Sequence, residues 1–162
     1  MGEIALTRVD YRMVHGQIAV GIIKRFGIDS VYVVDNEVVK DETLIDILTF
    51  GMQPGVSLRV CTVADCVDAY KKDSFGKGKH LIIFREIKSA YQAYQLGYDM
   101  KELDIGQSQM EKDRIRVYKS IISINEKELK MLQEMENGGV KVYFQPLPDD
   151  AAVTLADVAK KF

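Results

Sequence analysis

The stretch that decides the fold reads Arg8-Val-Asp-Tyr-Arg-Met-Val-His-Gly-Gln17. It follows a short apolar segment typical of a β-strand and leads into a segment whose apolar residues recur with the spacing of an α-helix. In α/β proteins, chemistry gathers in the crevice at the carboxyl ends of the strands, where helices begin. His15 lies at such a place and is one of only two histidines in the chain. We therefore expect its imidazole to be exposed and to face the amide groups of the helix.

Length and composition limit the classes of protein that the chain can form. With 162 residues, of which 47% are hydrophobic, we expect residues 1–162 to form one compact domain around one core. The formal net charge of -2 gives no electrostatic reason to expect nucleic acid as a partner. No segment approaches the ~20 apolar residues that span a bilayer, and the amino terminus lacks the pattern of a signal peptide. We expect a soluble, cytoplasmic protein.

Segments typical of strands and helices alternate along the whole chain. Strands are predicted at residues 4–9, 30–34, 57–61, 80–84, 102–105, 115–122 and 140–145. Helices, with their caps, are predicted at residues 15–27, 41–51, 62–72, 89–96, 123–138 and 154–162. Strands separated by helices indicate a mainly parallel sheet with helices on both faces. We expect a three-layer, doubly wound α/β fold with a sheet of about six or seven strands, of which one edge strand can be antiparallel.

Capping residues support the ends of several of these helices. Gly27 is expected to end the first helix as a left-handed cap, and Asp41 to begin the second. Capping boxes are predicted where a hydroxyl residue precedes an acidic one by three positions, at Thr62-Val-Ala-Asp65 and at Ser123-Ile-Asn-Glu126.

Two other groups of residues carry weak functional signals. Cys61 and Cys66 are expected to be small buried side chains, because a redox pair or metal site would need closer spacing or more ligands. The run Lys77-Gly-Lys-His80 has its glycines before a strand, whereas phosphate-binding loops follow one. His80 is expected at the surface, at the edge of the sheet opposite His15.

Several common kinds of site are excluded by the motifs. The chain lacks the Gly-x-Ser-x-Gly elbow of a serine hydrolase, and two histidines at opposite sheet edges with two cysteines do not form a zinc ligand set. Neither Gly-x-Gly-x-x-Gly nor a Walker lysine motif occurs, so nucleotide binding lacks its usual support. What remains is chemistry carried by one histidine.

The residues around His15 suit the transfer of a phosphoryl group. A neutral imidazole is a competent nucleophile, and the positive end of a helix dipole disfavours its protonated form. Arg12 offers a planar fork of donors to phosphate oxygens, and Asp10 can orient the arginine or the ring. Gly16 removes side-chain bulk where a phosphate would approach. The alternative is simple turn chemistry at a His-Gly pair, with a solvated Arg-Asp pair beside it.

The stretch from Arg8 to Gln17 resembles the signature of the IIB component of the mannose, fructose and sorbose family of bacterial sugar phosphotransferase systems. The resemblance extends over nearly the whole chain. Further matching segments are Val33-Val34-Asp35 with Asp41, Pro54-Gly55-Val56, residues 81–84, Ile105-Gly106, and the segment from Ser123 through Gly139-Val140 to Pro148.

The resemblance implies a phosphocarrier enzyme subunit. His15 would accept a phosphoryl group on Nδ1 from a phosphohistidine of the IIA protein and pass it to a sugar entering through the membrane IIC and IID components. Arg12, Gly16, Gln17 and the helix amides would hold the group, without a metal or other cofactor. The subunit would associate peripherally with the permease.

The resemblance also implies a docking surface for the IIA protein around His15. Tyr11, Met13 and Val14 are its candidates, and ordinary packing under the loop is the alternative for each. The alternative for the whole chain is a non-catalytic regulatory or binding module that retains the fold.

Two departures from the family pattern leave the class of sugar and the choice of partner open. Asp35-Asn36 stands where many members have two aspartates, and Ile105-Gly106-Gln107 only partly matches the usual glycine-rich turn.

Overall fold

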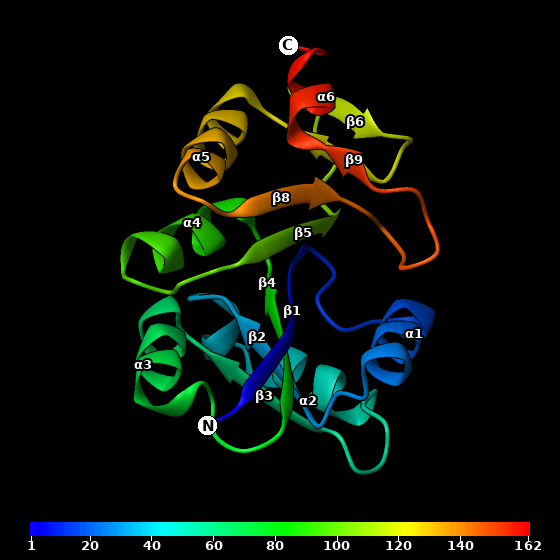
Figure 1. Ribbon diagram of the computed structural model, residues 1–162. Helices are drawn as coiled ribbons and strands as arrows, with labels where there is room; N and C mark the ends of the chain where they lie inside the picture. Colours follow the sequence, from blue (N-terminus) through cyan, green and yellow to red (C-terminus); the bar gives the residue numbers. More distant parts are fainter.

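A seven-stranded sheet runs through the molecule (Figure 1). The computed structural model describes the backbone of residues 1–162 and the side chains of all of them except Gln17 and Ile18. In spatial order the strands are β3 (Ser57–Cys61), β2 (Ser30–Val34), β4 (Lys79–Phe84), β1 (Glu3–Asp10), β5 (Glu102–Gln107), β8 (Lys141–Phe144) and β9 (Val153–Thr154). The first six pair in parallel, and β9 joins the edge antiparallel to β8.

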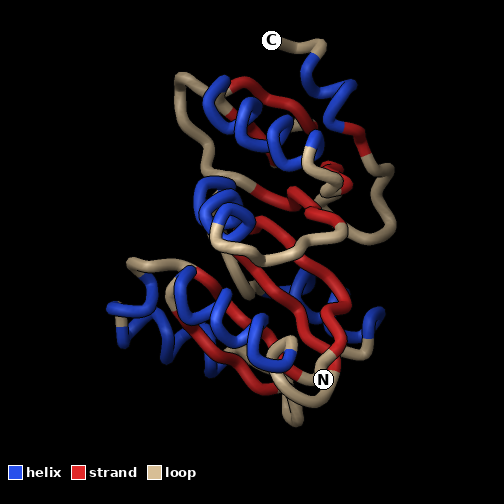
Figure 2. The backbone as a smooth tube through the Cα atoms, turned by 60° about the vertical axis from the view of Figure 1, so that its left-hand side comes forward, coloured by secondary structure: helices blue, strands red, loops and turns tan.

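Helices cover both faces of this sheet, as Figure 2 shows. The helices are α1 (Gly16–Phe26), η1 (Val38–Lys40), α2 (Glu42–Phe50), α3 (Val63–Asp73), α4 (Ile87–Gln95), α5 (Glu126–Asn137) and α6 (Leu155–Ala159). Apolar side chains of α1 and α2 pack in one core, and those of α3, α4 and α5 pack in another on the opposite face. The predicted three-layer, doubly wound α/β fold is thereby confirmed, including its antiparallel edge strand.

This winding places His15 at a switch point of the sheet. After β1 the chain enters α1 on one face of the sheet, whereas after β4, the neighbour of β1, it enters α4 on the other face. The two connections therefore part at the carboxyl ends of β1 and β4. Such a switch point is where ligands bind in open α/β sheets.

Most of the predicted helix ends are confirmed. Gly27 is left-handed, with φ 64°, and ends α1. The side chains of Asp41 and Thr62 accept hydrogen bonds from the third residues of α2 and α3, but among the described residues no bond from Thr62 N to the Asp65 carboxylate completes the predicted capping box. The capping box of α5, however, is formed by Asn125 and Glu128 and not by Ser123 and Glu126, because Ser123 belongs to a strand and its side chain bonds elsewhere.

One predicted strand was wrong, and the terminal helix, capped by Thr154 as predicted, ends earlier than expected, at Ala159. Residues 115–122 do not form one strand but a hairpin of β6 (Ile115–Tyr118) and β7 (Ile122–Ile124), outside the main sheet. Lys119 turns the chain there with a left-handed φ of 47°. The C-terminal segment begins with β9 at Val153, and its helix α6 starts at Leu155.

His80 is buried, with 2% of its surface exposed, and not on the surface as predicted. Its Nδ1 lies 2.5 Å from Ser30 Oγ and its Nε2 lies 2.8 Å from the Gly76 carbonyl oxygen. Residues 74–76 and Gly78 adopt positive φ and bend the preceding loop around the ring. The imidazole is therefore a hydrogen-bonded part of the fold.

Candidate functional site

Asp10, the last residue of β1, organises the loop that carries His15. Its backbone carbonyl accepts a hydrogen bond from Met13 N, at 3.0 Å, and its Oδ1 accepts one from Arg12 N, also at 3.0 Å. These two bonds reverse the chain, and Met13 completes the turn with a left-handed φ of 64°. Asp10 thus fixes the backbone of the loop, whereas its predicted role in orienting the Arg12 side chain or the His15 ring stays a prediction.

His15 is the N-cap residue of α1 and lies partly open to solvent. Its side chain is 28% exposed, and its backbone is extended while the helix begins at Gly16. Its Nε2 lies 3.9 Å from Asp10 Oδ1 and is shielded from solvent, with no hydrogen-bond partner among the described side chains. The ring thus turns Nε2 inward to the carboxylate, so its exposed part belongs to its other atoms.

The surroundings of His15 favour the neutral imidazole. Its pKa is lowered from the usual 6.5, chiefly because partial burial penalises the charged form, and the charges of Arg12 and Arg8 act in the same direction against that of Asp10. The pKa of Asp10 is raised by burial, which outweighs the opposing effect of Arg8. The first amides of α1 have no carbonyl partners within the helix, and its first turn holds no acidic side chain. This end of the helix is therefore suited to an anion.

Beneath the loop, Arg8 forms a buried network that the sequence analysis did not identify. The side chain is 1% exposed, and its Nε and Nη2 donate to Asp10 Oδ2 at 3.3 and 3.2 Å. Its Nη1 donates to Asp104 Oδ2 at 2.7 Å. The backbone carbonyls of Gln145 and Pro146 also accept from the guanidinium, at 3.1 and 2.7 Å. Arg8 thus ties β1 to β5 and to the segment after β8.

Gly106 makes room for the Arg8 guanidinium. The register between β1 and β5 shifts at this point, since Val9 pairs with Ile105 but Asp10 pairs with Gln107. Gly106 is the extra residue of this bulge, and a β-carbon on it would overlap the guanidinium group. The Ile105-Gly106 pair quoted in the sequence analysis therefore serves the network below His15.

The structure places Arg12 and Gly16 beside His15, whereas the side chain of Gln17 is not among those that it describes. The side chain of Arg12 is exposed, and its charge acts on the pKa of His15. Gly16 has a positive φ of 46°, and a β-carbon on it would meet no atom within 4 Å. The predicted contact of Gln17 with phosphate lies outside the described side chains.

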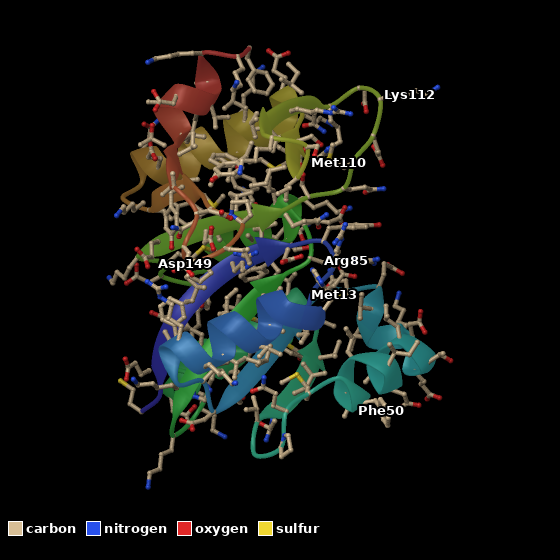
Figure 3. The ribbon with its side chains drawn as sticks, turned by 90° about the vertical axis from the view of Figure 1, so that its right-hand side faces the viewer. Met13, Phe50, Arg85, Met110, Lys112 and Asp149 are labelled. Atoms are coloured by element: carbon tan, nitrogen blue, oxygen red, sulfur yellow. The ribbon has the colours of Figure 1, made fainter. Side chains whose placement is uncertain are left out.

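The three candidates for a docking surface differ in their exposure. Met13 and Val14 are only 5% and 8% exposed and belong to the core beside α1 and α2, so the packing alternative holds for them. Tyr11 is partly exposed. Arg85, at the end of β4, lies over its ring at 4.5 Å from the centroid. Figure 3 labels Arg85, which lies beyond the carboxyl end of β4 and whose Nε also donates to the Tyr11 carbonyl oxygen at 3.5 Å.

Other candidates named from the sequence have structural roles. Asp35 is buried, and its Oδ2 accepts hydrogen bonds from the amides of residues 37 and 38, while Asn36 caps α3 at Val63 N. Cys66 is buried and Cys61 is half-buried. Among the described residues, no group of three or more His, Cys, Asp or Glu side chains could hold a metal ion.

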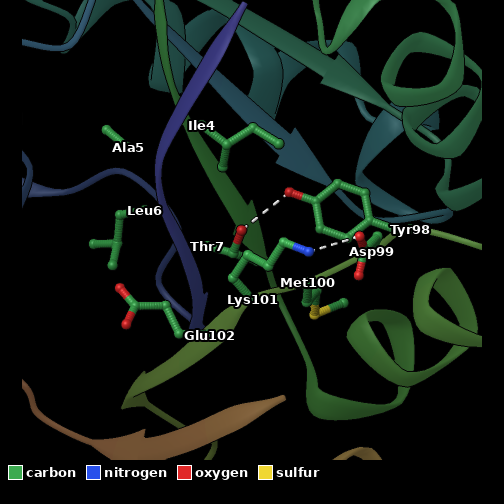
Figure 4. Close-up of a pocket in the computed structure, with 9 residues that line it drawn as sticks. All are labelled: Ile4, Ala5, Leu6, Thr7, Tyr98, Asp99, Met100, Lys101 and Glu102. Atoms are coloured by element: carbon green, nitrogen blue, oxygen red, sulfur yellow. Dashed lines mark hydrogen bonds and ion pairs between the residues drawn. The ribbon is translucent and has the colours of Figure 1, made fainter. Parts of the chain in front are cut away.

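A small cavity lies away from His15, by the amino ends of β1 and β5. It has a volume of about 170 Å³ and is lined by residues 4–7 and 98–102. Figure 4 shows the bond inside it from Tyr98 Oη to Thr7 Oγ1, 3.0 Å long. The cavity brings no nucleophile or charged cluster to the His15 site.

The chain matches the family described as "PTS system sorbose subfamily IIB component" over residues 4–162. It is 24% identical over 160 residues to the fructose-specific EIIB component of Bacillus subtilis, covering 99% of this chain and 98% of that protein. It is 22% identical to the mannose-specific EIIAB component of Escherichia coli, covering 98% of this chain and 49% of that protein.

Solved structures share the fold over almost the whole chain. manxB from Thermoanaerobacter tengcongensis superposes with a TM-score of 0.91 at 28% identity, covering 100% of this chain and 98% of that one. The IIBSor domain of the sorbose permease from Klebsiella pneumoniae superposes with a TM-score of 0.89 at 20% identity, covering 99% and 98%.

Proposed function

We propose that His15 is the phosphoryl carrier of this chain, which belongs to the family of PTS sorbose subfamily IIB components. Members of the family are phosphotransferase subunits of sugar uptake, and so is this chain. The observation that supports His15 is its position: a partly exposed, neutral imidazole at the N-terminus of α1 with Nε2 turned to a carboxylate.

The orientation of the ring supports Nδ1 as the reacting nitrogen. Nε2 is shielded and lies on the side of Asp10, so Nδ1 is the nitrogen left for in-line approach. Its lone pair attacks phosphorus while the bond from phosphorus to the donor nitrogen breaks, and that electron pair returns to the donor ring. The His15 ring then carries positive charge with its proton on Nε2, and Asp10 stabilises it across 3.9 Å.

The remaining residues of the site hold the transferred group. Its negative oxygens face the first amides of α1, and the exposed Arg12 neutralises part of their charge through its fork of donors. Gly16 leaves the approach open, and Gln17 is the remaining candidate donor. Transfer between two imidazoles of similar potential needs mainly positioning and charge neutralisation, so no metal or cofactor takes part.

The donor is a IIA protein, and the acceptor is a sugar delivered by membrane IIC and IID components. One relative is named as an EIIAB component and this chain matches 49% of it, which supports a IIA partner. Within the part of the chain that the structure describes, no helix is long and apolar enough to cross a membrane. We place the chain at the cytoplasmic side of the permease, with Tyr11 at the edge of the surface that meets the IIA protein.

Phosphorylation with labelled phosphoenolpyruvate, the general proteins of the phosphotransferase system and a cognate IIA protein tests the proposal. We expect one phosphate per chain, labile in acid and stable in base, that is lost completely in His15→Ala. His80→Ala is the matched control and keeps the label. If the His15→Ala variant still becomes labelled, another residue carries the phosphate.

The alternative, a binding or regulatory module that retains the fold, predicts a different result in the same experiment. A folded wild-type chain that accepts no phosphate from any IIA protein of its organism would favour the module.

A further inference from the structure

Two buried carboxylates share the single positive charge of Arg8. Asp10 on β1 and Asp104 on β5 are 0% and 3% exposed, and both bond to the guanidinium, at 3.2 and 2.7 Å. With both carboxylates ionised, the buried cluster carries a net negative charge. Asp104 also has one oxygen, Oδ1, that is buried and without a hydrogen-bond partner among the described side chains.

Consecutive contacts connect Asp104 to His15. Asp104 Oδ2 accepts from Arg8 Nη1, Arg8 Nη2 donates to Asp10 Oδ2, and the other oxygen of Asp10 lies 3.9 Å from His15 Nε2. Arg8 cannot leave this arrangement easily, because two backbone carbonyls also hold it. A change of charge at Asp104 therefore acts on Asp10 and on the His15 ring above it. It does so directly, by electrostatic interaction, and indirectly, because Asp104 and Asp10 bind the same guanidinium group of Arg8.

The environment of Asp104 lets its charge change near neutral pH. Burial raises the pKa of its carboxyl to about 7, although Arg8 opposes this rise. Besides Asp10, which belongs to the cluster, the titratable groups near it among the described side chains are His15 beyond the end of β1, Glu102 on the same strand as Asp104, and Tyr143 on β8, which pairs with Asp104. Arg8 is the cation that contacts both aspartates.

We propose that Asp104 is a positioning residue for the phosphoryl carrier, whose negative charge acts through Arg8 and Asp10 to set how readily the His15 ring takes up a proton. The inference rests on the proposed role of His15. When Asp104 is ionised, it competes with Asp10 for Arg8, and more of the negative charge of Asp10 is felt by the imidazole. When Asp104 is protonated, Arg8 and Asp10 neutralise each other and the ring loses this support.

The consequence concerns the phosphorylated state. A ring with phosphorus on Nδ1 and hydrogen on Nε2 is positively charged, so an ionised Asp104 stabilises it and a protonated one does not. Asp104 thereby couples the stability of the phosphorylated carrier to pH in the physiological range.

A titration of the two histidine rings by NMR, with the unphosphorylated protein, tests the proposal. In the wild type, the His15 resonances should show a second step near pH 7 that coincides with the titration of the Asp104 carboxyl carbon. In Asp104→Asn, which keeps an oxygen for Arg8, this step should vanish, while the main His15 titration, which lies below pH 6.5 where Asp104 is already protonated, should stay close to that of the wild type. The His80 resonances report whether the variant remains folded.

Asp149→Asn is the matched control. It removes the same charge from a carboxylate that is 93% exposed and pairs with Arg25. This variant should leave the His15 titration unchanged. A His15 step near pH 7 that persists in Asp104→Asn would overturn the proposal. If the variant does not fold, absence of the second step in the wild type would overturn it as well.

The experiment separates this inference from the proposed function. A His15 step near pH 7 that depends on Asp104, in a chain that never accepts phosphate, would sustain the link between Asp104 and His15 and refute the carrier role. Phosphate acceptance without that step would do the opposite.

Discussion

The two histidines lie at opposite ends of two neighbouring strands, β1 and β4, and their surroundings differ. His80, at the amino end of β4, has both ring nitrogens within hydrogen-bond distance of oxygen atoms and is 2% exposed. His15, beyond the carboxyl end of β1, is 28% exposed and has no hydrogen bond to its ring among the described side chains. An imidazole with both nitrogens satisfied stabilises a fold, whereas one with free nitrogens, near an anion-binding helix end, is available for reaction.

The same contrast holds for the groups around each ring. The His80 ring lies among the rings of Tyr32 and Phe75, with centroids at 5.8 and 5.9 Å. His15 lies above Arg8, Asp10 and Asp104, three charged side chains that are almost completely buried. Burying charge costs stability unless it is fully compensated. The carboxyl ends of the strands, here called the carboxyl edge, are therefore the part of the fold through which the free energy of unfolding should depend on pH.

The largest effect is expected for the pH dependence of stability at the carboxyl edge. The pKa of Asp104 is about 7 in the folded chain and 3.8 for the ordinary group, so the folded state binds the proton more tightly. Its contribution to stability is full below pH 4, decreases as the pH rises, and is lost above pH 7. Relative to Asp104→Asn, the free energy of unfolding of the wild type should fall by about 3 kcal/mol between pH 4 and pH 8.

Urea unfolding of both proteins across this pH range measures the difference. Asp149→Asn should follow the wild type in parallel, since its carboxylate is exposed. Parallel curves for Asp104→Asn would mean that Asp104 has an ordinary pKa.

A smaller effect, on stability alone, is expected from replacing each histidine in turn. His80→Ala leaves Ser30 Oγ and the Gly76 carbonyl without their partner and opens a cavity beside Tyr32 and Phe75, which should cost about 2–3 kcal/mol. His15→Ala should change stability by less than about 0.5 kcal/mol, because the side chain is partly exposed and contributes little packing. Urea unfolding at one pH compares the two variants directly, and equal losses would remove the distinction between the two edges.

The contrast between the edges could be predicted only in part from the sequence. Strands, helices and most caps follow from local patterns, so the place of His15 between the first strand and the first helix could be predicted. The strand order that makes this place a switch point depends on the pairing of strands distant in sequence. The hairpin after Arg114 could not, because Lys119 turns the chain without the glycine or asparagine that usually marks such a turn. The burial of His80 depends on the loop around Gly76, which closes over the ring in three dimensions.

The buried network below His15 depends on contacts between distant segments. Arg8 and Asp104 are 96 positions apart and meet only because β1 pairs with β5. One local signal was available: Arg8 and Asp10 are two positions apart in a strand, so they lie on the same face. A pair of opposite charges on one face of an otherwise apolar central strand predicts a buried ion pair, and the sequence analysis did not use it.

The smallest effect is expected from replacing Arg12, and it tests which groups at the carboxyl edge bind the phosphoryl oxygens. Arg12→Lys keeps the charge that helps to hold His15 neutral but replaces a planar fork of donors with a single ammonium group. The rate of phosphoryl transfer from the IIA protein should fall about tenfold. Rapid-quench measurement of the first turnover gives this rate, with Arg25→Lys in the last turn of α1 as the control. A wild-type rate in Arg12→Lys would mean that Arg12 acts through its charge alone, and the amides of α1 would then be the groups that recognise the phosphoryl oxygens.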